Sequence, residues 1–333
     1  MSISDEFTAN NLKNNHVAKK LNRLRVTLSN NIVGQQNLID SMLICLLCDG
    51  HMLIEGMPGL AKTTAAKALA MGLEGEFNRI QFTPDLLPSD LIGSDILNQE
   101  TQKFTFKKGP IFHNVVLADE INRAPAKVQS ALLEAMEEKQ VTVGEKSYKL
   151  SELFMVLATQ NPIEQEETYQ LPEAQLDRFL MQVLVTYPTH EQELKILELN
   201  EKRNSRHDLL NIEITKQKEI FAARQEVRGI YVDPKLKDYI VSLVRATREP
   251  GAYQKTLTPW LRYGASPRAS IALLECAKAW AWLLECDYVS PEHIKYVAPN
   301  ILRHRVLPSF EAQAEGVVAE QIVQELLRLV AIP

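Results

Sequence analysis

The feature that most constrains the fold is the stretch at residues 54–64, IEGMPGLAKTT, in which a loop with two glycines and a proline separates two regular patterns. The apolar residues 51–54 predict a strand, and residues 62–71, rich in Ala, Lys and Leu, predict a helix. This order is typical of a phosphate-binding loop, whose backbone N–H groups and helix N-terminus face the phosphates. In such a loop Lys62 would reach the β- and γ-phosphates, and the Thr63 hydroxyl would ligate Mg²⁺.

One position departs from this pattern. The pattern G-x-x-x-x-G-K-[ST] has glycine before the lysine, whereas this chain has Ala61. Alanine adds only a methyl group and suits the first turn of a helix, so we expect the loop to keep its close approach to a phosphate. Taken alone, the stretch also fits a Gly/Pro turn followed by a solvated lysine.

Length and composition narrow the class of protein. The 333 residues indicate roughly two domains, and 45% hydrophobic with 24% charged residues is ordinary for a globular protein. The net charge of −5 argues against binding nucleic acid through overall charge, although a local basic groove is compatible with it. No apolar run approaches the roughly 20 residues that span a membrane, and the N-terminus lacks a signal-like segment. We therefore expect a cytoplasmic protein.

Strand and helix patterns alternate over the first half of the chain. An amphipathic helix within residues 1–30 and a second helix at 36–48 precede the loop. Further strands are predicted at residues 77–83, 115–119, 153–159 and 181–186, with helices between them, notably at 126–139. This alternation predicts an α/β fold with a parallel, doubly wound sheet.

Two β-hairpin inserts interrupt this alternation. One lies within residues 84–114 and pairs 95–98 with 103–107, and the other pairs 140–143 with 148–150 across a turn at 144–147. Such hairpins either cover sheet edges or contact a partner.

After residue 189 the pattern is helical, with helices predicted at 192–202, 216–226, 234–247, 270–286, 291–302 and 315–330. We therefore expect residues 1–188 to form the nucleotide-binding domain, with 1–30 as a helical extension. Residues 189–333 would form an α-helical lid domain.

Two strands end in polar side chains. Residues 115–118 run into Asp119 and Glu120, which places both carboxylates at the carboxyl edge of a parallel sheet, where such folds bind ligands. There Asp119 would hold Mg²⁺ and Glu120 would polarise the attacking water. Asn161 follows the apolar strand at 153–159 and could position water or contact the γ-phosphate, although an Asn-Pro turn is an equally ordinary reason for it.

Two arginines stand where a cation could act on phosphate. Arg178, just before the last strand, could stabilise transition-state charge across a subunit boundary. Alternatively, it could pair with a carboxylate of its own chain such as Asp177, or contact the end of a helix. Arg268 follows Ser-Pro in the first turn of a predicted helix, where the helix dipole disfavours a cation. A cation placed there suggests a use, such as reaching a phosphate from the helical domain.

These motifs in this order resemble the AAA+ ATPases and, more narrowly, the MoxR family. The resemblance is carried by residues 55–63, 119–125, 158–162, 171–179 and 264–269, and it extends over nearly the whole chain from about residue 31. The family tolerates alanine before the loop lysine, which supports a phosphate-binding role for the loop around Ala61.

The resemblance implies roles for individual residues. Asp119 and Glu120 match Walker B, Asn161 matches sensor 1, Arg178 the arginine finger and Arg268 sensor 2. Arg123 is a second candidate for an interface role, and the two hairpins are similar to the family's helix-2 insert and pre-sensor-1 hairpin. Walker A corresponds to Gly56, Met57, Pro58, Gly59, Leu60, Ala61, Lys62, Thr63 and Thr64, and the segment lining the adenine pocket to Ile32, Val33 and Gly34.

The resemblance also implies a function. It indicates a homo-oligomer, a hexameric ring that uses ATP and Mg²⁺ for chaperone-like remodelling, maturation or activation of client proteins, including metal-cofactor insertion. A partner with a von Willebrand factor A domain is expected, and nucleic acid is not. Three alternatives stay open: the motor subunit of a metal chelatase, a nucleic-acid remodeller using Lys103, Lys107 and Lys108, and a nucleotide-gated scaffold, against which the Asp119–Glu120 pair argues.

Overall fold

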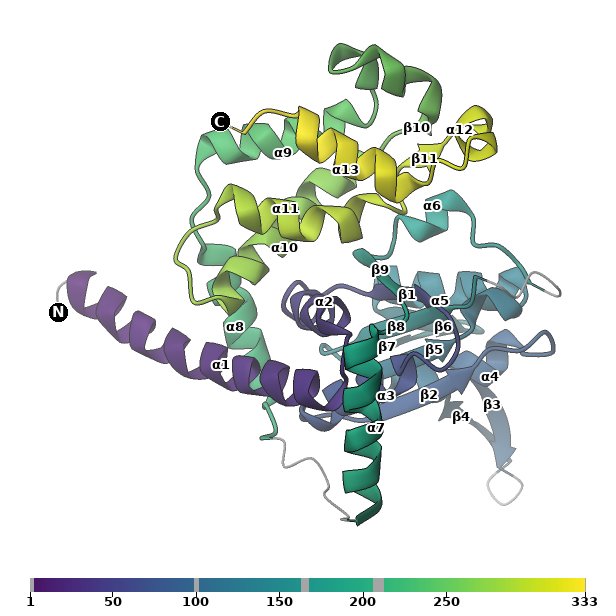
Figure 1. Cartoon of the computed structure of the whole chain (residues 1–333). Helices are drawn as coiled ribbons and strands as arrows, with labels where there is room; N and C mark the ends of the chain where they lie inside the picture. Colours follow the sequence, from purple (N-terminus) through teal and green to yellow (C-terminus); the bar gives the residue numbers. More distant parts are fainter. Residues whose placement is uncertain (1–2, 99–101, 163–167, 206–212, 333) are drawn as a thin grey trace. The chain divides into compact units, whose positions relative to one another are not determined.

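The computed structural model describes residues 3–98, 102–162, 168–205 and 213–332 (Figure 1). The chain divides into two compact units. An α/β unit comprises Arg23–Phe179 and Val183–Gln217, and a helical unit comprises Met1–Asn22, Leu180–Gln182 and Lys218–Pro333. The domain boundary at residue 188 stays a prediction.

A five-stranded sheet forms the centre of the α/β unit, in the order β2-β5-β8-β1-β9. The pairs β2–β5, β5–β8 and β8–β1 are parallel, which confirms the predicted α/β fold. The strands are β1 (Met52–Gly56), β2 (Phe77–Gln81), β5 (Val115–Asp119), β8 (Met155–Gln160) and β9 (Met181–Val185). Because β1 lies inside the sheet between β8 and β9, the loop that follows it opens at the carboxyl edge where α/β folds bind ligands.

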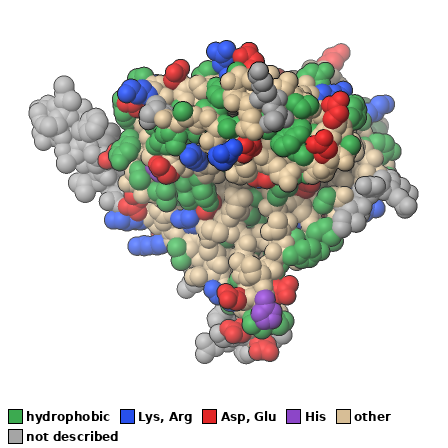
Figure 2. Space-filling view, turned by 45° about the horizontal axis from the view of Figure 1, so that its top comes forward, with side chains coloured by type: hydrophobic (Ala, Val, Ile, Leu, Met, Phe, Trp, Pro, Cys, Tyr) green, Lys and Arg blue, Asp and Glu red, His purple; other side chains and the backbone are tan. Residues whose placement is uncertain are grey.

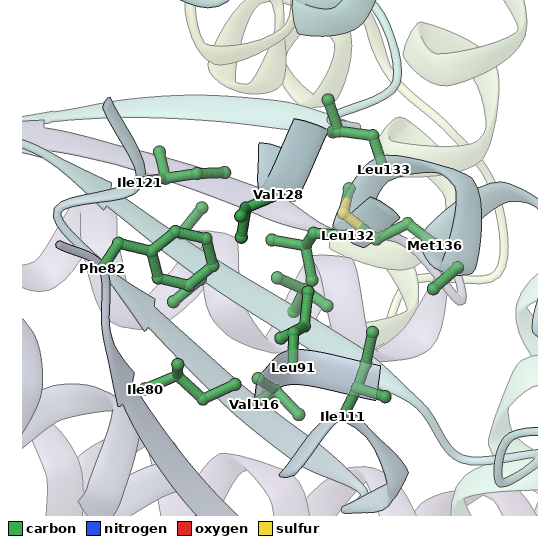
Figure 3. Packing of buried hydrophobic residues seen from close by; sticks show 14 of the residues in the cluster. Ile80, Phe82, Leu91, Ile111, Val116, Ile121, Val128, Leu132, Leu133 and Met136 are labelled. Carbon is green, nitrogen blue, oxygen red and sulfur yellow. The ribbon is translucent and has the colours of Figure 1, made fainter. Parts of the chain in front are cut away.

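The helices of the α/β unit form where apolar residues recur at helical spacing. In α5 the residues Val128, Leu132, Leu133 and Met136 are buried, and Figure 3 shows them in one cluster with Val116 of β5 and Leu91 of α4. Each such side chain contributes roughly 1.5–3 kcal/mol on burial. The helices are α2 (Gln36–Leu47), α3 (Lys62–Met71), α4 (Pro88–Ile92), α5 (Ala126–Glu138), α6 (Glu173–Leu176) and α7 (His190–Ser205), with the 3₁₀ turns η1 (Pro110–Phe112) and η2 (Ile121–Arg123); α1 (Ile3–Asn31) runs through both units.

Both predicted hairpins are present. The first pairs β3 (Gly93–Asn98) with β4 (Lys103–Lys108), and the second pairs β6 (Gln140–Val143) with β7 (Lys146–Lys149). The second turn is shorter than expected, since Gly144 with φ 61° reverses the chain and β7 already begins at Lys146. The residues predicted to link the first pair fall partly at 99–101, outside the described residues.

The two hairpins contact each other and the core of the α/β unit. Phe106 of β4 stacks on Tyr148 of β7 with ring centroids 4.0 Å apart and meets Phe112 edge-on at 5.8 Å. Val141 and Leu150 are buried in the same hydrophobic core. The second hairpin therefore packs on the core of the α/β unit, whereas the outer part of the first is exposed. Whether the hairpins cover sheet edges or contact a partner stays a prediction.

Three helices of the helical unit, α9, α10 and α12, begin with a residue whose side chain caps the helix. The helices α9, α10 and α11 each have proline in the first turn, where its missing N–H is not needed. Asp233 accepts a hydrogen bond from the Lys235 backbone N–H at 2.8 Å and so caps α9. The helices are α8 (Gln217–Gly229), α9 (Pro234–Ala246), α10 (Pro267–Leu283), α11 (Pro291–Leu302), α12 (Phe310–Ala314) and α13 (Ala319–Leu329), with η3 (Pro250–Ala252), η4 (Lys255–Trp260) and a small pair, β10 (Leu261–Tyr263) and β11 (Leu307–Pro308).

The helix predicted at residues 315–330 begins later than expected. Gly316 has φ 75°, a left-handed conformation that ends α12, and α13 starts only at Ala319. Among the residues described, none of the helices combines the length and the apolar character that crossing a membrane requires.

Candidate nucleotide site

The loop between β1 and α3 is shaped by its glycines. A Cβ on Gly56 would lie 2.6 Å from the Val185 carbonyl oxygen, so glycine allows β1 and β9 to approach closely. Gly59 has φ 83° and open space around it, so its role is conformational rather than steric. Both glycines thus serve the turn that leads from the strand to the helix N-terminus.

Ala61 occupies a conformation that favours glycine. It is the N-cap of α3 with φ 58° and ψ 19°, in the left-handed region. The expectation that Ala61 lies in the first helical turn is therefore wrong, because the helix begins at Lys62. A left-handed alanine costs roughly 1–2 kcal/mol, which the rest of the loop must offset. This conformation explains why the general pattern has glycine at this position.

Lys62 is buried, and its ammonium group lies at the carboxyl edge of the sheet. Its Nζ donates to the Gly56 carbonyl and to the Gln160 carbonyl, the latter at 3.4 Å. These two oxygens end β1 and β8, so the lysine spans neighbouring strands. Thr63 is half-buried beside it, and Thr64 is exposed. A phosphate at the helix N-terminus could exchange with these carbonyl oxygens as the lysine's partner.

Asp119, at the end of β5, is buried and held on both carboxylate oxygens. Its Oδ1 accepts from the Thr159 hydroxyl at 2.5 Å, and its Oδ2 accepts from Arg79 at 2.6 and 2.9 Å. Thr159 lies on β8 and Arg79 on β2, the two strands that flank β5. The carboxylate is therefore fixed in place by both neighbouring strands, in charge-assisted hydrogen bonds.

Glu120 has a strained backbone and a well-contacted side chain. Its φ of 57° is left-handed, and its N–H donates to the Thr159 hydroxyl at 2.9 Å. Its Oε2 accepts from Gln81 at 2.7 Å and from Arg123 at 3.2 Å. A non-glycine residue in this region points to a constraint imposed by its surroundings, and such strain concentrates at functional sites.

Three of these residues escaped the sequence interpretation: Arg79, Gln81 and Thr159. In the sequence, Arg79 and Gln81 alternate with Ile80 of β2, so both lie on the strand face opposite Ile80. Their role appears only from the register, in which Gln81 pairs with Asp119 across the parallel strands. Thr159 stands at the end of an apolar run, and the sequence pattern indicates only that it belongs to a strand.

Asn161 and the segment at residues 32–34 also belong to the α/β unit. Asn161 is 6% exposed and follows Gln160, whose carbonyl accepts from Lys62. Gly34 has φ 82° at the turn after α1, while Ile32 is buried and Val33 half-buried. A Cβ on Gly34 would lie 2.8 Å from the Gln192 side chain of α7, so this turn packs closely against that helix.

The two candidate arginines lie in different units. Arg178 follows α6 and forms an ion pair with Glu137 of α5 at 3.1 Å, an intrachain partner other than the suggested Asp177. Arg268 lies in the helical unit, in the first turn of α10, where its backbone N–H donates to the Ser266 cap at 3.2 Å. The structure therefore brings together Lys62, Asp119, Glu120 and the end of β8, while Arg178 is engaged elsewhere.

Comparison with known proteins agrees with this geometry. Residues 51–181 match the model of the ATPase family associated with various cellular activities, and residues 257–326 match the AAA lid domain. A crystal structure of an ATPase candidate from Cytophaga hutchinsonii superposes with a TM-score of 0.90 at 46% identity, covering 98% of this chain and 99% of that one.

Two relatives are similar over most of the chain. Uncharacterized protein YeaC of Bacillus subtilis is 47% identical over 91% of each chain. Chaperone MoxR1 of Mycobacterium tuberculosis is 42% identical over 91% of this chain and 79% of its own length. With the lysine and the two carboxylates gathered at one sheet edge, these matches show that this chain is an ATPase and belongs to the MoxR family of AAA+ ATPases.

Proposed function

We propose that the chain hydrolyses ATP at sites completed by a neighbouring protomer, and uses the hydrolysis to remodel client proteins. The observation that carries the proposal is the convergence of Lys62, Asp119 and Glu120 at the carboxyl ends of β1, β5 and β8, while Arg178 pairs with Glu137. Membership of the AAA+ family suggests an oligomeric ring, and we propose a hexamer.

The residues at the site fit a magnesium nucleotide. Mg²⁺ is usually held by one or two protein ligands together with phosphate oxygens and water, and Thr63 with Asp119 supplies such a donor set. Among the described residues no group of three or more His, Cys, Asp or Glu side chains could hold a metal by itself, which also suits an ion held largely by phosphate. When bound, the ion would neutralise charge on the phosphates.

Glu120 is the proposed base for the attacking water. In the structure its Oε2 accepts from Gln81 and from Arg123, which orients the carboxylate, and its second oxygen, Oε1, would take the proton from water. The Thr159 hydroxyl accepts from the Glu120 N–H and donates to Asp119, so it ties the backbone of the proposed base to the carboxylate of Asp119.

Arg178 is the proposed contribution to a neighbour's site. Its ion pair with Glu137 is partly exposed, and such pairs are worth roughly 0–1 kcal/mol, so a phosphate of the neighbouring protomer could displace the glutamate. Three further roles rest on the family resemblance. We propose that Arg268 senses the phosphate, that residues 32–34 contact the adenine and that Asn161 lies near the γ-phosphate.

The β3–β4 hairpin is the proposed client contact. Phe104 is 70% exposed and pairs with Leu97, 49% exposed, on the hairpin face that also carries Phe106. Exposed apolar side chains that lie together on one face mark interaction surfaces, whereas single ones need no explanation. The face of the molecule in Figure 2 carries acidic and basic side chains intermixed, which does not favour a nucleic-acid client.

The finer biological role is proposed from the family. We propose a cytoplasmic, chaperone-like activity that matures or activates clients, including insertion of metal cofactors, with a partner carrying a von Willebrand factor A domain. The relative named as a chaperone supports this choice over the chelatase and scaffold alternatives.

The client contact can be tested with Phe104→Ser. Aggregation of reduced, unfolded lysozyme, followed by light scattering with and without ATP, should be suppressed by the native protein and less by the variant, while ATP turnover is retained. Ile96→Ser is the matched control, because Ile96 is 45% exposed but lies on the opposite hairpin face. Equal suppression by both variants would contradict the assignment of this face.

A further inference from the structure

Two arginines after α11 hold a three-residue segment of the chain, Leu180–Gln182, at the start of β9. Arg305 donates to the Leu180 carbonyl at 3.2 Å and to the Ile301 carbonyl at 2.6 Å. Arg303 donates to the Gln182 carbonyl at 2.7 Å. Each arginine thus holds the backbone at one end of the segment.

Both arginine side chains are largely shielded from solvent and hydrogen-bonded. Arg305 is 7% exposed, and the Arg303 side chain is 9% exposed. Glu320 of α13 accepts from Arg303 at 2.5 and 2.9 Å, and Asn300 accepts from it at 2.7 Å. Hydrogen bonds from charged donors are stronger than those between neutral groups, and removing the donor leaves its partner buried and unpaired. The two arginines therefore form a rigid clamp on the segment.

The clamped segment is the place where the chain changes units. Phe179 is fully buried in the core of the α/β unit, whereas Leu180–Gln182 belong to the helical unit and the rest of β9 returns to the α/β unit. A single peptide link therefore joins an anchor in one unit to an anchor in the other. Arg178 stands one residue before that link, in the α/β unit.

We propose that Arg303 and Arg305 are positioning residues for Arg178, because they hold the backbone that begins two residues after it. This inference rests on the proposed function, in which Arg178 acts on the nucleotide of a neighbouring protomer. The clamp fixes the backbone on the carboxyl side of Arg178, and α6 fixes it on the amino side through the Gln175 carbonyl, which accepts from the Arg178 N–H at 3.2 Å. Loosening the clamp misplaces the guanidinium while the protomer's own Lys62, Asp119 and Glu120 stay in place.

A purely structural role makes a different prediction. If the arginines only stabilise the helical unit, their loss lowers the stability of the protomer and acts on its own nucleotide site. If they position Arg178, the defect lies in the site of the neighbour and can be rescued by a protomer whose own Arg178 is intact. Mixing two defective proteins separates these cases, because each supplies what the other lacks.

The experiment uses the full-length chain with Arg305→Ala and Arg305→Lys. We expect ATP turnover to fall in Arg305→Ala by ten- to a hundredfold, since a misplacement of about 1 Å can cost about a hundredfold, and Arg305→Lys to recover part of it. The affinity for a fluorescent ATP analogue should change less than about twofold. Arg245→Lys is the matched control, because Arg245 is 63% exposed in the same unit and pairs with Glu249.

Mixing with Lys62→Ala protein is the decisive step. Turnover should return when Arg305→Ala or Arg305→Lys is mixed with it, as it should for Arg178→Ala. If turnover returns when Lys62→Ala is mixed with Arg178→Ala but not when it is mixed with either Arg305 variant, the positioning role is wrong and the shared site is supported. Failure with Arg178→Ala as well would overturn the shared site itself. A loss of nucleotide affinity in Arg305→Lys that matches its loss of turnover would also overturn the inference.

Discussion

The carboxyl edge of the sheet and the helical unit differ in how their backbones are held. At the sheet edge Ala61 and Glu120 both have left-handed φ values, of 58° and 57°, next to side chains bound in charge-assisted hydrogen bonds. In the helical unit α9 and α10 begin with an Asp or Ser cap and a proline, the residues that local helix chemistry favours. Left-handed φ values also occur where helices end, at Lys139 after α5 and at Glu285 after α10 in the helical unit. The sheet edge differs in that its two left-handed residues lie in the proposed phosphate site rather than at the end of a helix.

Among the substitutions that test this difference between the two regions, we expect the largest effect at Thr159. Thr159→Val keeps the shape of the side chain but leaves the Glu120 N–H and Asp119 Oδ1 without their shared partner. We expect the free energy of unfolding to fall by about 1–3 kcal/mol and ATP turnover to fall as well. Urea unfolding and steady-state turnover measure both. A variant as active and as stable as the native protein would show that the network does not hold the strained backbone.

A smaller effect, on stability alone, is expected in the helical unit. Asp233→Ala removes the cap of α9 and should cost about 0.5–2 kcal/mol, with turnover unchanged. Thermal unfolding measures the change, and Asp233→Asn, which retains a capping oxygen, is the control. If Asp233→Ala lost turnover while its stability stayed unchanged, the cap of α9 would act on activity rather than on stability, which contradicts the difference proposed between the two regions.

The smallest effect is expected at Ala61. Ala61→Gly relieves the left-handed strain of roughly 1–2 kcal/mol but adds the backbone entropy of glycine, about 0.5–1 kcal/mol. The net result should be a gain in stability below about 1 kcal/mol, with nucleotide affinity kept. Ala65→Gly, inside α3, should instead destabilise. Destabilisation by both substitutions would show that Ala61 is not strained.

Local patterns predicted the elements of the fold well where one signal dominated. Strand β5 matches its predicted range because four apolar residues run directly into two acids, and α11 matches because Ser290 and Pro291 mark its start. The helix predicted at 315–330 was wrong at its start, because the turn at Gly316 depends on a backbone conformation that the apolar spacing does not report.

The candidate site was predictable only in part. Lys62 and Asp119 stand in motifs contiguous in sequence, whereas Arg79 and Thr159 join the site through pairing of strands that are distant in sequence. The partner of Arg178 shows the same limit: Glu137 lies 41 positions away (178 − 137), and no sequence periodicity links the two. What pairs across strands or between helices depends on tertiary register, which local patterns do not contain.

The most direct test of the shared site is ATP turnover per protomer as a function of protein concentration, with Glu120→Gln as the control for background hydrolysis. Turnover of the Glu120→Gln variant should be about 10²–10⁴-fold lower, which is the usual contribution of a general base. We predict that turnover per protomer of the native chain rises with concentration as protomers assemble. Turnover that is independent of concentration, from a protein whose mass in solution is that of the 37.7 kDa protomer, would contradict a site completed by Arg178 of a neighbour.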